Sequence, residues 1–436
     1  MHEPQPNRSL SRHIEDGYLT GVLLLVFSWL IPLAYSQSSG SIGFDVETGV
    51  TAGARALTLQ EGTPLFQWAI ASCYVISGMV LLRRVRPLRL PMEMLLPIGV
   101  VVLAAASLLW SESPAITLRR TVGLVGTSVL AMHLGWCCDW PRLSRLLGLA
   151  AGIACGTSLA ASLLFPEWAV HRGGDHDGDW RGLFIQKNVA GTAMVVGLLL
   201  AFANAGTAWP SRWRWSAVLG LITVTGIIMS GSRTAWFLAT SVSLTAAWLA
   251  LARHRRVAAQ VVTVVGVAVL VAAAIAVFDV FHSAERPEQV TLLGRDMTAT
   301  GRYALWNALA PYIADRPLAG YGFRGFWSGL GPSLEVWNAI GWEPANAHSS
   351  WVDTMLELGL LGVALVLALV VSSVLLLWSR WRGLSVGQAI WSLGIVGLLT
   401  LQGLSDTTLL EPNGLLWTAF LASFFHLLRP IQPAPA

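Results

Sequence analysis

The chain has 436 residues, of which 54% are hydrophobic and 12% are charged, with a formal net charge of +4 and a mean hydropathy of +0.61. This composition excludes an ordinary soluble globular protein and indicates a polytopic membrane protein. The sequence contains no basic tract with interleaved aromatic residues, so a nucleic acid is not expected as a partner.

Apolar runs recur along the chain, and a helix needs roughly twenty apolar residues to cross a bilayer. The runs begin near Tyr18, Leu65, Met92, Ile116, Ser144, Val189, Trp215, Arg233, Val257, His348, Val386 and Pro412. We therefore expect an all-α polytopic membrane protein with about 12 transmembrane helices. Helices 1 to 9 occupy residues 1–281 and helices 10 to 12 occupy residues 348–436, and a long, partly helical loop at residues 282–347 separates the two groups.

The arginines predict the orientation, because the cytoplasmic loops of membrane proteins are enriched in Lys and Arg. When the N-terminus is placed in the cytoplasm, every predicted cytoplasmic segment contains arginine, and the densest group lies at residues 83–89. Both termini are therefore expected in the cytoplasm, and the long loop is expected on the outer side. Basic residues that remain on the outer side become candidates for function.

Arg119 and Arg120 follow Pro114, which suits the first turn of a helix. At 1.5 Å per residue they lie about 8 Å along that helix from its outer end. From this depth an arginine either reaches back to lipid headgroups or faces inward and holds a lipid phosphate. The sequence leaves both readings open.

The outer loop at residues 166–188 contains histidines and aspartates, but their spacing fits neither a calcium loop nor a zinc site. We therefore expect no metal here. Lys187, the sole lysine of the chain, shares this loop with Arg181 at the membrane boundary, which predicts anion binding. Arg233 follows the short turn at residues 230–232 and sits near a helix N-terminus, a position that suits either a phosphate or an interfacial anchor.

The long loop carries many aromatic residues, so we expect it to be ordered. Residues 302–314 repeat apolar positions at three and four, which predicts an amphipathic helix on the membrane surface with Arg302 in its first turn. Residues 320–325 match G-x-G-x-x-G, but no strand precedes them, so these glycines are interpreted as turn residues. His348 ends the loop, with Asp353 and Glu357 at i, i+4 spacing behind it, and this junction favours a functional histidine.

Several segments of the chain together resemble one known family. They are residues 293–302 (LGRDMTATGR), Trp306, residues 316–322 (RPLAGYG), Ala347-His348 and residues 356–359 (LELG), supported by residues 110–120, 182–184, Lys187-Asn188, Ser232-Arg233, 410–412 and Trp417. This pattern resembles the O-antigen ligase/polymerase superfamily, and within it the exopolysaccharide polymerases of succinoglycan type. The resemblance extends from Trp110 to the C-terminus.

The resemblance implies a glycosyltransferase of the bacterial inner membrane with its active site facing the periplasm. Such an enzyme transfers a glycan from undecaprenyl diphosphate to a sugar hydroxyl and needs no metal or nucleotide cofactor. Its partners are the lipid-linked oligosaccharide donor, the glycan acceptor, the bilayer and other polysaccharide export proteins. The family's essential arginines and loop histidine correspond to Arg233, Arg302 and His348. Transfer to lipid A core or to a protein by a ligase is the alternative, and a polysaccharide-lipid transporter is a more distant one.

The residue types fit this chemistry. Diphosphate is a good leaving group, so the reaction needs its growing negative charge neutralised, and an arginine fork provides this permanently. Arg233 and Arg302 are expected to do so with help from Arg119, Arg120, Arg181 and Lys187. His348 is expected to take the proton of the attacking hydroxyl in an inverting displacement. Trp306, Tyr321 and Trp327 are expected to stack on sugar rings.

Overall fold

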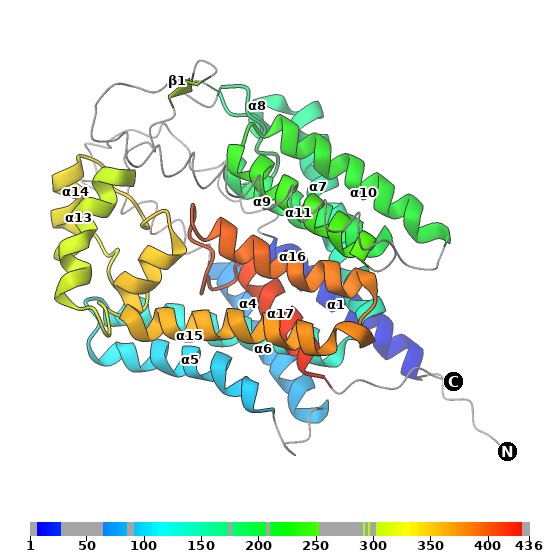
Figure 1. Ribbon diagram of the computed structural model, residues 1–436, viewed down its shortest axis with the longest axis horizontal. Helices are drawn as coiled ribbons and strands as arrows, with labels where there is room; N and C mark the ends of the chain where they lie inside the picture. Colours follow the sequence, from blue (N-terminus) through cyan, green and yellow to red (C-terminus); the bar gives the residue numbers. More distant parts are fainter. Residues whose placement is uncertain are drawn as a thin grey trace.

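The computed structural model describes residues 7–27, 64–84, 91–172, 177–205, 210–252, 291–292, 295–296 and 302–429. Helices dominate these residues (Figure 1). They are α1 (Asn7–Val26), α4 (Pro64–Arg84), α5 (Leu95–Ala106), α6 (Pro114–Cys137), α7 (Trp140–Leu164), α8 (Pro166–Ala169), α9 (Lys187–Ala205), α10 (Pro210–Met229), α11 (Arg233–Ala252), α13 (Arg302–Asp315), α14 (Pro332–Ile340), α15 (Ser350–Arg380), α16 (Val386–Gln402) and α17 (Leu415–Leu428). Short 3₁₀ turns lie at Met92–Met94, Ser107–Leu109 and Trp381–Gly383.

A small antiparallel hairpin is an exception to the all-α expectation. Strands β1 (Thr291–Leu292) and β2 (Arg295–Asp296) pair Thr291 with Asp296 and Leu292 with Arg295. The hairpin lies in the long loop, so it leaves the helical bundle unchanged.

Five helical stretches of the described chain are long and apolar enough to cross a membrane: Met92–Leu109, Trp140–Leu164, Lys187–Ala205, Arg233–Ala252 and Ser350–Gly383. Three shorter apolar helices are Trp213–Met229, Val386–Gln402 and Leu415–Leu428. These helices agree with a largely α-helical, multi-pass membrane protein. The number of twelve stays a prediction, since the run expected from Val257 lies outside the described residues.

Neighbouring helices in the bundle pack closely where small residues meet. Helix α6 packs on α4 and α17, while α9 packs on α7, α10, α11 and α16. At Gly135 of α6, a Cβ atom would lie 2.2 Å from the carbonyl oxygen of Ala422 in α17. Only glycine therefore allows this approach, which follows the general use of small residues where membrane helices touch.

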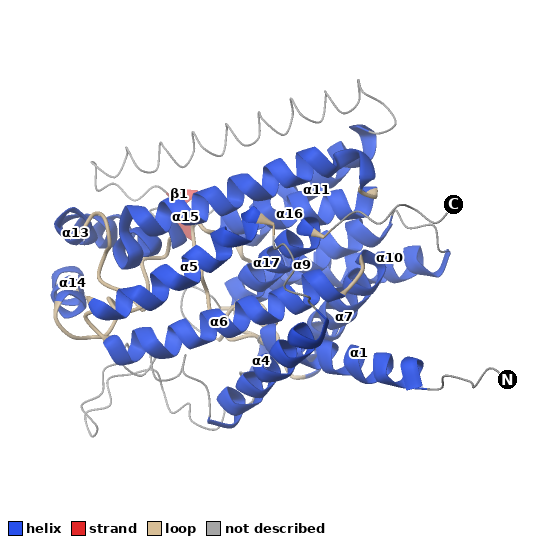
Figure 2. Cartoon of the chain, turned by 90° about the horizontal axis from the view of Figure 1, so that it is seen from below, coloured by secondary structure: helices blue, strands red, loops and turns tan. Residues whose placement is uncertain are grey.

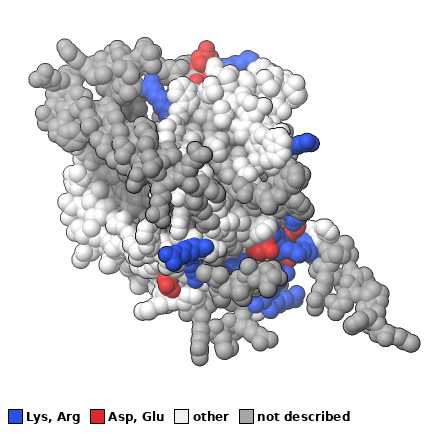
Figure 3. Space-filling model, turned by 45° about the vertical axis from the view of Figure 1, so that its right-hand side comes forward, with Lys and Arg blue, Asp and Glu red and all other residues white. Residues whose placement is uncertain are grey.

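One end of the bundle carries a network of partly buried charges that joins α1, α4, α6 and α7. Glu15 accepts hydrogen bonds from Arg84 at 2.8 and 3.0 Å and lies 3.2 Å from Nε2 of His133. Asp16 accepts from Nε of Arg142 at 2.6 Å. Among the described residues on the face drawn in Figure 3, charged side chains lie in small groups between uncharged ones. The arginines at the ends of α4 and α7 thus also bind helices together.

The described part of the long loop is ordered and lies at the opposite end, where Figures 1 and 2 show α13 and α14 beside the start of α15. It has a small apolar core of its own. The buried members of this core are Leu305, Leu309, Tyr321, Phe326, Trp327, Val336, Trp337, Ala347 and Leu356. Helix α13 begins at Arg302, as the sequence predicts.

Helix α15 is broken at Gly359, where φ is 63° and ψ is −161°. The loop backbone fills the break: the amide of Tyr321 donates to the carbonyl of Leu356, and the amide of Gly322 donates to that of Glu357, both at 2.9 Å. Gly320 and Gly322 have φ of 62° and 96°, conformations that glycine adopts readily. These glycines shape a turn, as the sequence interpretation held.

Candidate active site

His348 lies between α14 and α15, and hydrogen bonds hold the backbone around it on both sides. Its own amide donates to Oδ1 of Asn346 at 2.9 Å. The amide of Ala347 donates to Oδ1 of Asp353 at 2.9 Å, and the carbonyl of Ala347 accepts from the indole of Trp306 at 2.8 Å. The position of the imidazole is therefore set by side chains from the loop, α13 and α15.

The backbone of His348 is strained, because its φ of 51° lies in the left-handed region. Such a conformation costs roughly 1–3 kcal/mol and persists only where the surroundings impose it. Four non-glycine residues in the described chain have positive φ, namely Arg324, His348, Leu410 and Asn413. They lie in loops that meet near the start of α15, since Arg324 pairs with Glu411 and Leu409 bonds to Ser350. Strained backbone conformations of this kind cluster at active sites and ligand-binding sites, so this region is the candidate site.

Arg302 faces His348 from the first turn of α13. The half-buried imidazole has its pKa lowered by desolvation and by the positive charge of Arg302, against which Asp353 acts in the opposite direction. Burial also lowers the pKa of Arg302, while the nearby carboxylate of Asp406 opposes that change. The pKa of Asp406 is raised by its own burial. The structure thus brings together His348 and Arg302, two of the three residues that the sequence places at the centre of catalysis.

Trp342 lies against His348 with ring centroids 5.9 Å apart and an angle of 24° between the planes. The indole is 37% exposed. The two rings are therefore stacked with an offset, and the imidazole is half-buried. No described residue donates a hydrogen bond to either ring nitrogen of His348.

Two of the three aromatic residues predicted to bind sugar are buried. Tyr321 and Trp327 are each 3% exposed, so neither presents a ring face to a substrate, and the prediction fails for them because they form the loop's own core. Trp327 donates its indole N–H to Asp353 at 2.9 Å. Tyr321 lies 4.4 Å beneath the guanidinium of Arg316. The third residue, Trp306, is partly exposed and also fixes Ala347.

A second buried charge cluster lies deeper along α15. Arg324 approaches Glu357 to 3.9 Å and forms an ion pair with Glu411. The two carboxylates raise the pKa of Arg324 against the effect of burial. Arg324 therefore connects the long loop to α15 and to the loop before α17.

Lys187 and Arg233 are the first residues of α9 and α11, two helices that pack against each other. The ammonium of Lys187 pairs with Asp179 at 2.6 Å, and this lysine is buried. An incoming anion would have to displace Asp179, which weakens the expectation that Lys187 binds diphosphate. Arg233 begins α11 directly after Ser232, whose hydroxyl donates to Asn188 at 3.0 Å. Arg233 is thus held beside the start of α9, at the N-terminus of its own helix.

The other candidate arginines are placed less centrally. Arg181 donates to the carbonyl of Trp168 at 2.8 Å, and burial lowers its pKa. Arg120 lies three residues from Thr117, which donates to the carbonyl of Phe323 at 2.8 Å, while Arg119 is exposed. Helical spacing therefore puts Arg120, rather than Arg119, on the side of α6 that contacts the long loop.

No group of three or more His, Cys, Asp or Glu side chains in the described ranges is arranged to hold a metal ion. Part of the aspartate-rich loop, residues 173–176, lies outside them.

Sequence reasoning gave no specific role to Trp342, Asn346, Arg324 or Asp406. Trp342 was one of several aromatic residues in the loop, with no spacing that links it to His348. Asp406 could have been noticed, because it is a carboxylate between two apolar runs. The positive φ of Arg324 has no sequence signal, and the enrichment of histidine at positive φ is too weak a signal to predict the backbone of His348.

Comparison with known proteins gives two matches. The O-antigen ligase family model (Wzy_C) matches residues 215–367, a region that contains Arg233, Arg302 and His348. The exopolysaccharide production protein ExoQ of Rhizobium meliloti (strain 1021) is 26% identical over 285 residues, so the match spans 62% of this chain and 62% of that relative. These matches confirm the resemblance: the chain is similar to the O-antigen ligase/polymerase family and, within it, to an exopolysaccharide production protein.

Proposed function

We propose that the protein is a glycosyltransferase of the bacterial inner membrane that polymerises exopolysaccharide or O-antigen repeat units. The donor is a glycan on undecaprenyl diphosphate, and the acceptor is a sugar hydroxyl. One observation carries the proposal: His348, held in a strained backbone, lies beside Arg302 and an exposed tryptophan at the end of the bundle away from the charge network of α1. The active site faces the periplasm, and both termini are cytoplasmic.

The proposed reaction is a single displacement. His348 takes the proton of the acceptor hydroxyl while that oxygen forms a bond to the anomeric carbon. The bond from this carbon to the diphosphate oxygen breaks, the configuration inverts, and undecaprenyl diphosphate leaves. The lowered pKa keeps the imidazole neutral and able to accept the proton. Arg302 and Arg233 neutralise the charge that grows on the leaving group.

The sugar surface belongs to Trp342 and Trp306. Trp342 is exposed and already adjacent to the base, so a sugar stacked on its free face has a hydroxyl near His348. Trp306 is partly exposed one turn after Arg302. These two rings take the place of Tyr321 and Trp327.

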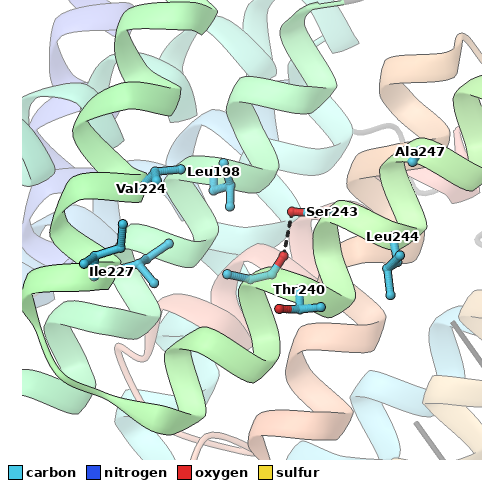
Figure 4. Close-up of a pocket in the computed structure, with 9 residues that line it drawn as sticks. Leu198, Val224, Ile227, Thr240, Ser243, Leu244 and Ala247 are labelled. Carbon is cyan, nitrogen blue, oxygen red and sulfur yellow. Dashed lines mark hydrogen bonds between the residues drawn. The ribbon is translucent and has the colours of Figure 1, made fainter. Parts of the chain in front are cut away.

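An apolar groove on the flank of the bundle supports the proposal that the donor is lipid-linked. The groove has a volume of about 470 Å³ and is lined by residues of α9, α10 and α11, including Leu198 and Ile227 (Figure 4). The hydroxyls of Thr240 and Ser243 donate to carbonyls of their own helix at 2.9 and 2.7 Å, so both residues present an apolar surface. Thr240 lies about 10 Å along α11 from Arg233. A diphosphate held at Arg233 could therefore place its prenyl chain in this groove.

The experiment that tests the function uses the purified protein in lipid nanodiscs with an undecaprenyl-diphosphate-linked repeat unit alone. A polymerase extends this donor into a ladder of longer lipid-linked glycans, which gel electrophoresis resolves. Failure to consume the donor with any acceptor refutes the proposed glycosyltransferase.

A ligase is the second candidate, because the matching family model is described as O-antigen ligase. In that case the donor is consumed only after lipid A core or an acceptor protein is added, and no ladder forms without it. The same assay therefore separates the two functions.

A further inference from the structure

Asp353 occupies a central position in the site that the function above does not use. It lies in the first turn of α15 and is 3% exposed. Its Oδ1 accepts hydrogen bonds from the backbone amide of Ala347 and from the indole N–H of Trp327, both at 2.9 Å. Its Oδ2 accepts a hydrogen bond from the hydroxyl of Thr407. One carboxylate therefore joins the segment before His348, the long loop and the loop after α16.

We propose that Asp353 is the positioning residue of the active site: its carboxylate fixes the strained His348 segment and stabilises the imidazolium that forms when His348 accepts a proton. This inference rests on the proposed function of His348 as the base. Asp353 is buried and bonded to the backbone amide of Ala347, so it acts through His348 and not on the reacting atoms.

The hydrogen bonds explain the positioning part. A histidine backbone with positive φ persists only where the surrounding structure fixes it. Asp353 fixes the peptide directly before His348 through its hydrogen bond with the amide of Ala347. Trp327 and Thr407 in turn fix the carboxylate from two other segments. Removing the carboxylate also leaves the buried amide of Ala347 and the indole of Trp327 without an acceptor, which is costly.

Charge explains why an acid suits this position. Among the described groups, Arg302 on α13 and Asp353 on α15 act on His348 in opposite senses, and Asp406 lies beside Arg302. The negative charge of Asp353 favours the protonated imidazole, while Arg302 favours the neutral one. Three hydrogen bonds stabilise the carboxylate of Asp353. Proton transfer to His348 thus takes place between groups of opposite charge, which limits the energy change when the imidazole becomes charged.

The test compares Asp353→Asn with Asp353→Ala in nanodiscs. Asparagine has nearly the same shape, its oxygen can accept from Ala347 and Trp327, and its amide can donate to the hydroxyl of Thr407. It therefore removes the charge and keeps the positioning. Alanine removes both. Thr354→Val is the matched control, because Thr354 is equally buried on α15 and bonds only to Ser350 of its own helix among the described residues.

Two readouts are measured against pH. The first is kcat and the donor KM. The second is the rate at which diethyl pyrocarbonate, which attacks neutral imidazole, modifies His348 in the tryptic peptide. The second readout needs no activity, so it stays informative if the proposed glycosyl transfer is not observed.

We expect Asp353→Asn to move the midpoint of His348 modification, and the acid limb of kcat, to lower pH, since the group that raised the imidazole pKa is gone. We expect Asp353→Ala to lower kcat by roughly a hundredfold or more, the scale of general base catalysis, with the donor KM little changed. The Thr354→Val enzyme should match the parent protein in both readouts.

An unmoved midpoint in Asp353→Asn overturns the charge role, and an Asp353→Ala enzyme with near-normal kcat overturns the positioning role. If alanine prevents folding, Thr407→Val removes a single hydrogen bond and should still lower kcat without changing the donor KM. An inactive parent protein with a normal midpoint shift refutes the function but not the electrostatic coupling.

Discussion

Trp342 is stacked on His348, and their ring centroids are 5.9 Å apart. The indole is thus both a wall of the imidazole site and an exposed surface of the size of a sugar ring. The pair connects the proposed recognition of the acceptor to the proposed proton transfer.

Trp342→Ala should raise the KM for the acceptor about two- to tenfold, because an aromatic stacking contact contributes about 0.5–1.5 kcal/mol. Trp342→Phe should retain part of the affinity, and the donor KM should stay constant. Steady-state kinetics with varied acceptor measures this. Trp378→Ala is the control, because Trp378 is exposed on α15 far from His348. An acceptor KM unaffected by Trp342→Ala would exclude the stacking role.

His348→Ala should lower kcat by roughly a hundred- to ten-thousand-fold, since it removes the proposed base. Donor affinity, measured by direct binding to the purified variant, should stay near normal because the arginines remain. His13→Ala removes an exposed histidine of α1 and should have no effect. A folded His348→Ala protein with near-normal turnover would remove His348 from the mechanism.

Arg302→Gln should move the acid limb of the kcat profile to higher pH. The positive charge of Arg302 lowers the pKa of His348, so its loss raises that pKa. The base must be neutral, and activity is lost as the pH falls through the pKa; a raised pKa therefore brings the loss at higher pH. This direction is opposite to that expected for Asp353→Asn. Two shifts in the same direction would contradict the arrangement of charges around the imidazole.

Bulky residues in the groove of Figure 4 should block the prenyl chain. Ala247→Trp is expected to raise the KM for an undecaprenyl-linked donor, with a much smaller effect on a donor carrying a short prenyl chain. Leu221→Trp is the control, since Leu221 is exposed on α10 and does not line the groove. Equal effects of Ala247→Trp on the two donors would place the lipid elsewhere.

Gly359→Ala should destabilise the protein. Its φ of 63° and ψ of −161° fall in a region that is essentially restricted to glycine, at a cost of about 1–3 kcal/mol for other residues. In addition, a Cβ atom would lie 2.3 Å from the carbonyl carbon of Leu318. Thermal unfolding in detergent should show a lower midpoint. Gly397→Ala, where no atom lies within 4 Å of the added Cβ, should raise or preserve the midpoint, and equal behaviour of the two variants would refute the argument.

Apolar run length is a strong local signal, so the helices that begin near Leu65, Met92, Lys187 and Arg233 were predictable from sequence. The position of His348 at a loop-to-helix junction was predictable for the same reason. The pairing of Lys187 with Asp179 was not, because they lie eight positions apart and the geometry of the loop between them decides whether they meet.

The burial of Tyr321 and Trp327 also could not be predicted from the sequence. An aromatic residue in an outer loop can form a substrate platform or a small core, and composition is the same in both cases. Here the two residues pack with Phe326, Val336 and Leu356, which are distant in the sequence, and so they form a small core.

The break in α15 also constrains how the chain is made. The carbonyls of Leu356 and Glu357 and the amide of Leu360 have their partners in residues 317–322, not in their own helix. A nascent α15 released alone into lipid would expose these groups to hydrocarbon, at several kcal/mol for each. Stable insertion of α15 therefore requires residues 317–322 to pack against it. Membrane insertion of this helix is thus coupled to the folding of the outer loop that carries the proposed active site, so an inserted chain with an unfolded loop is expected to be unstable.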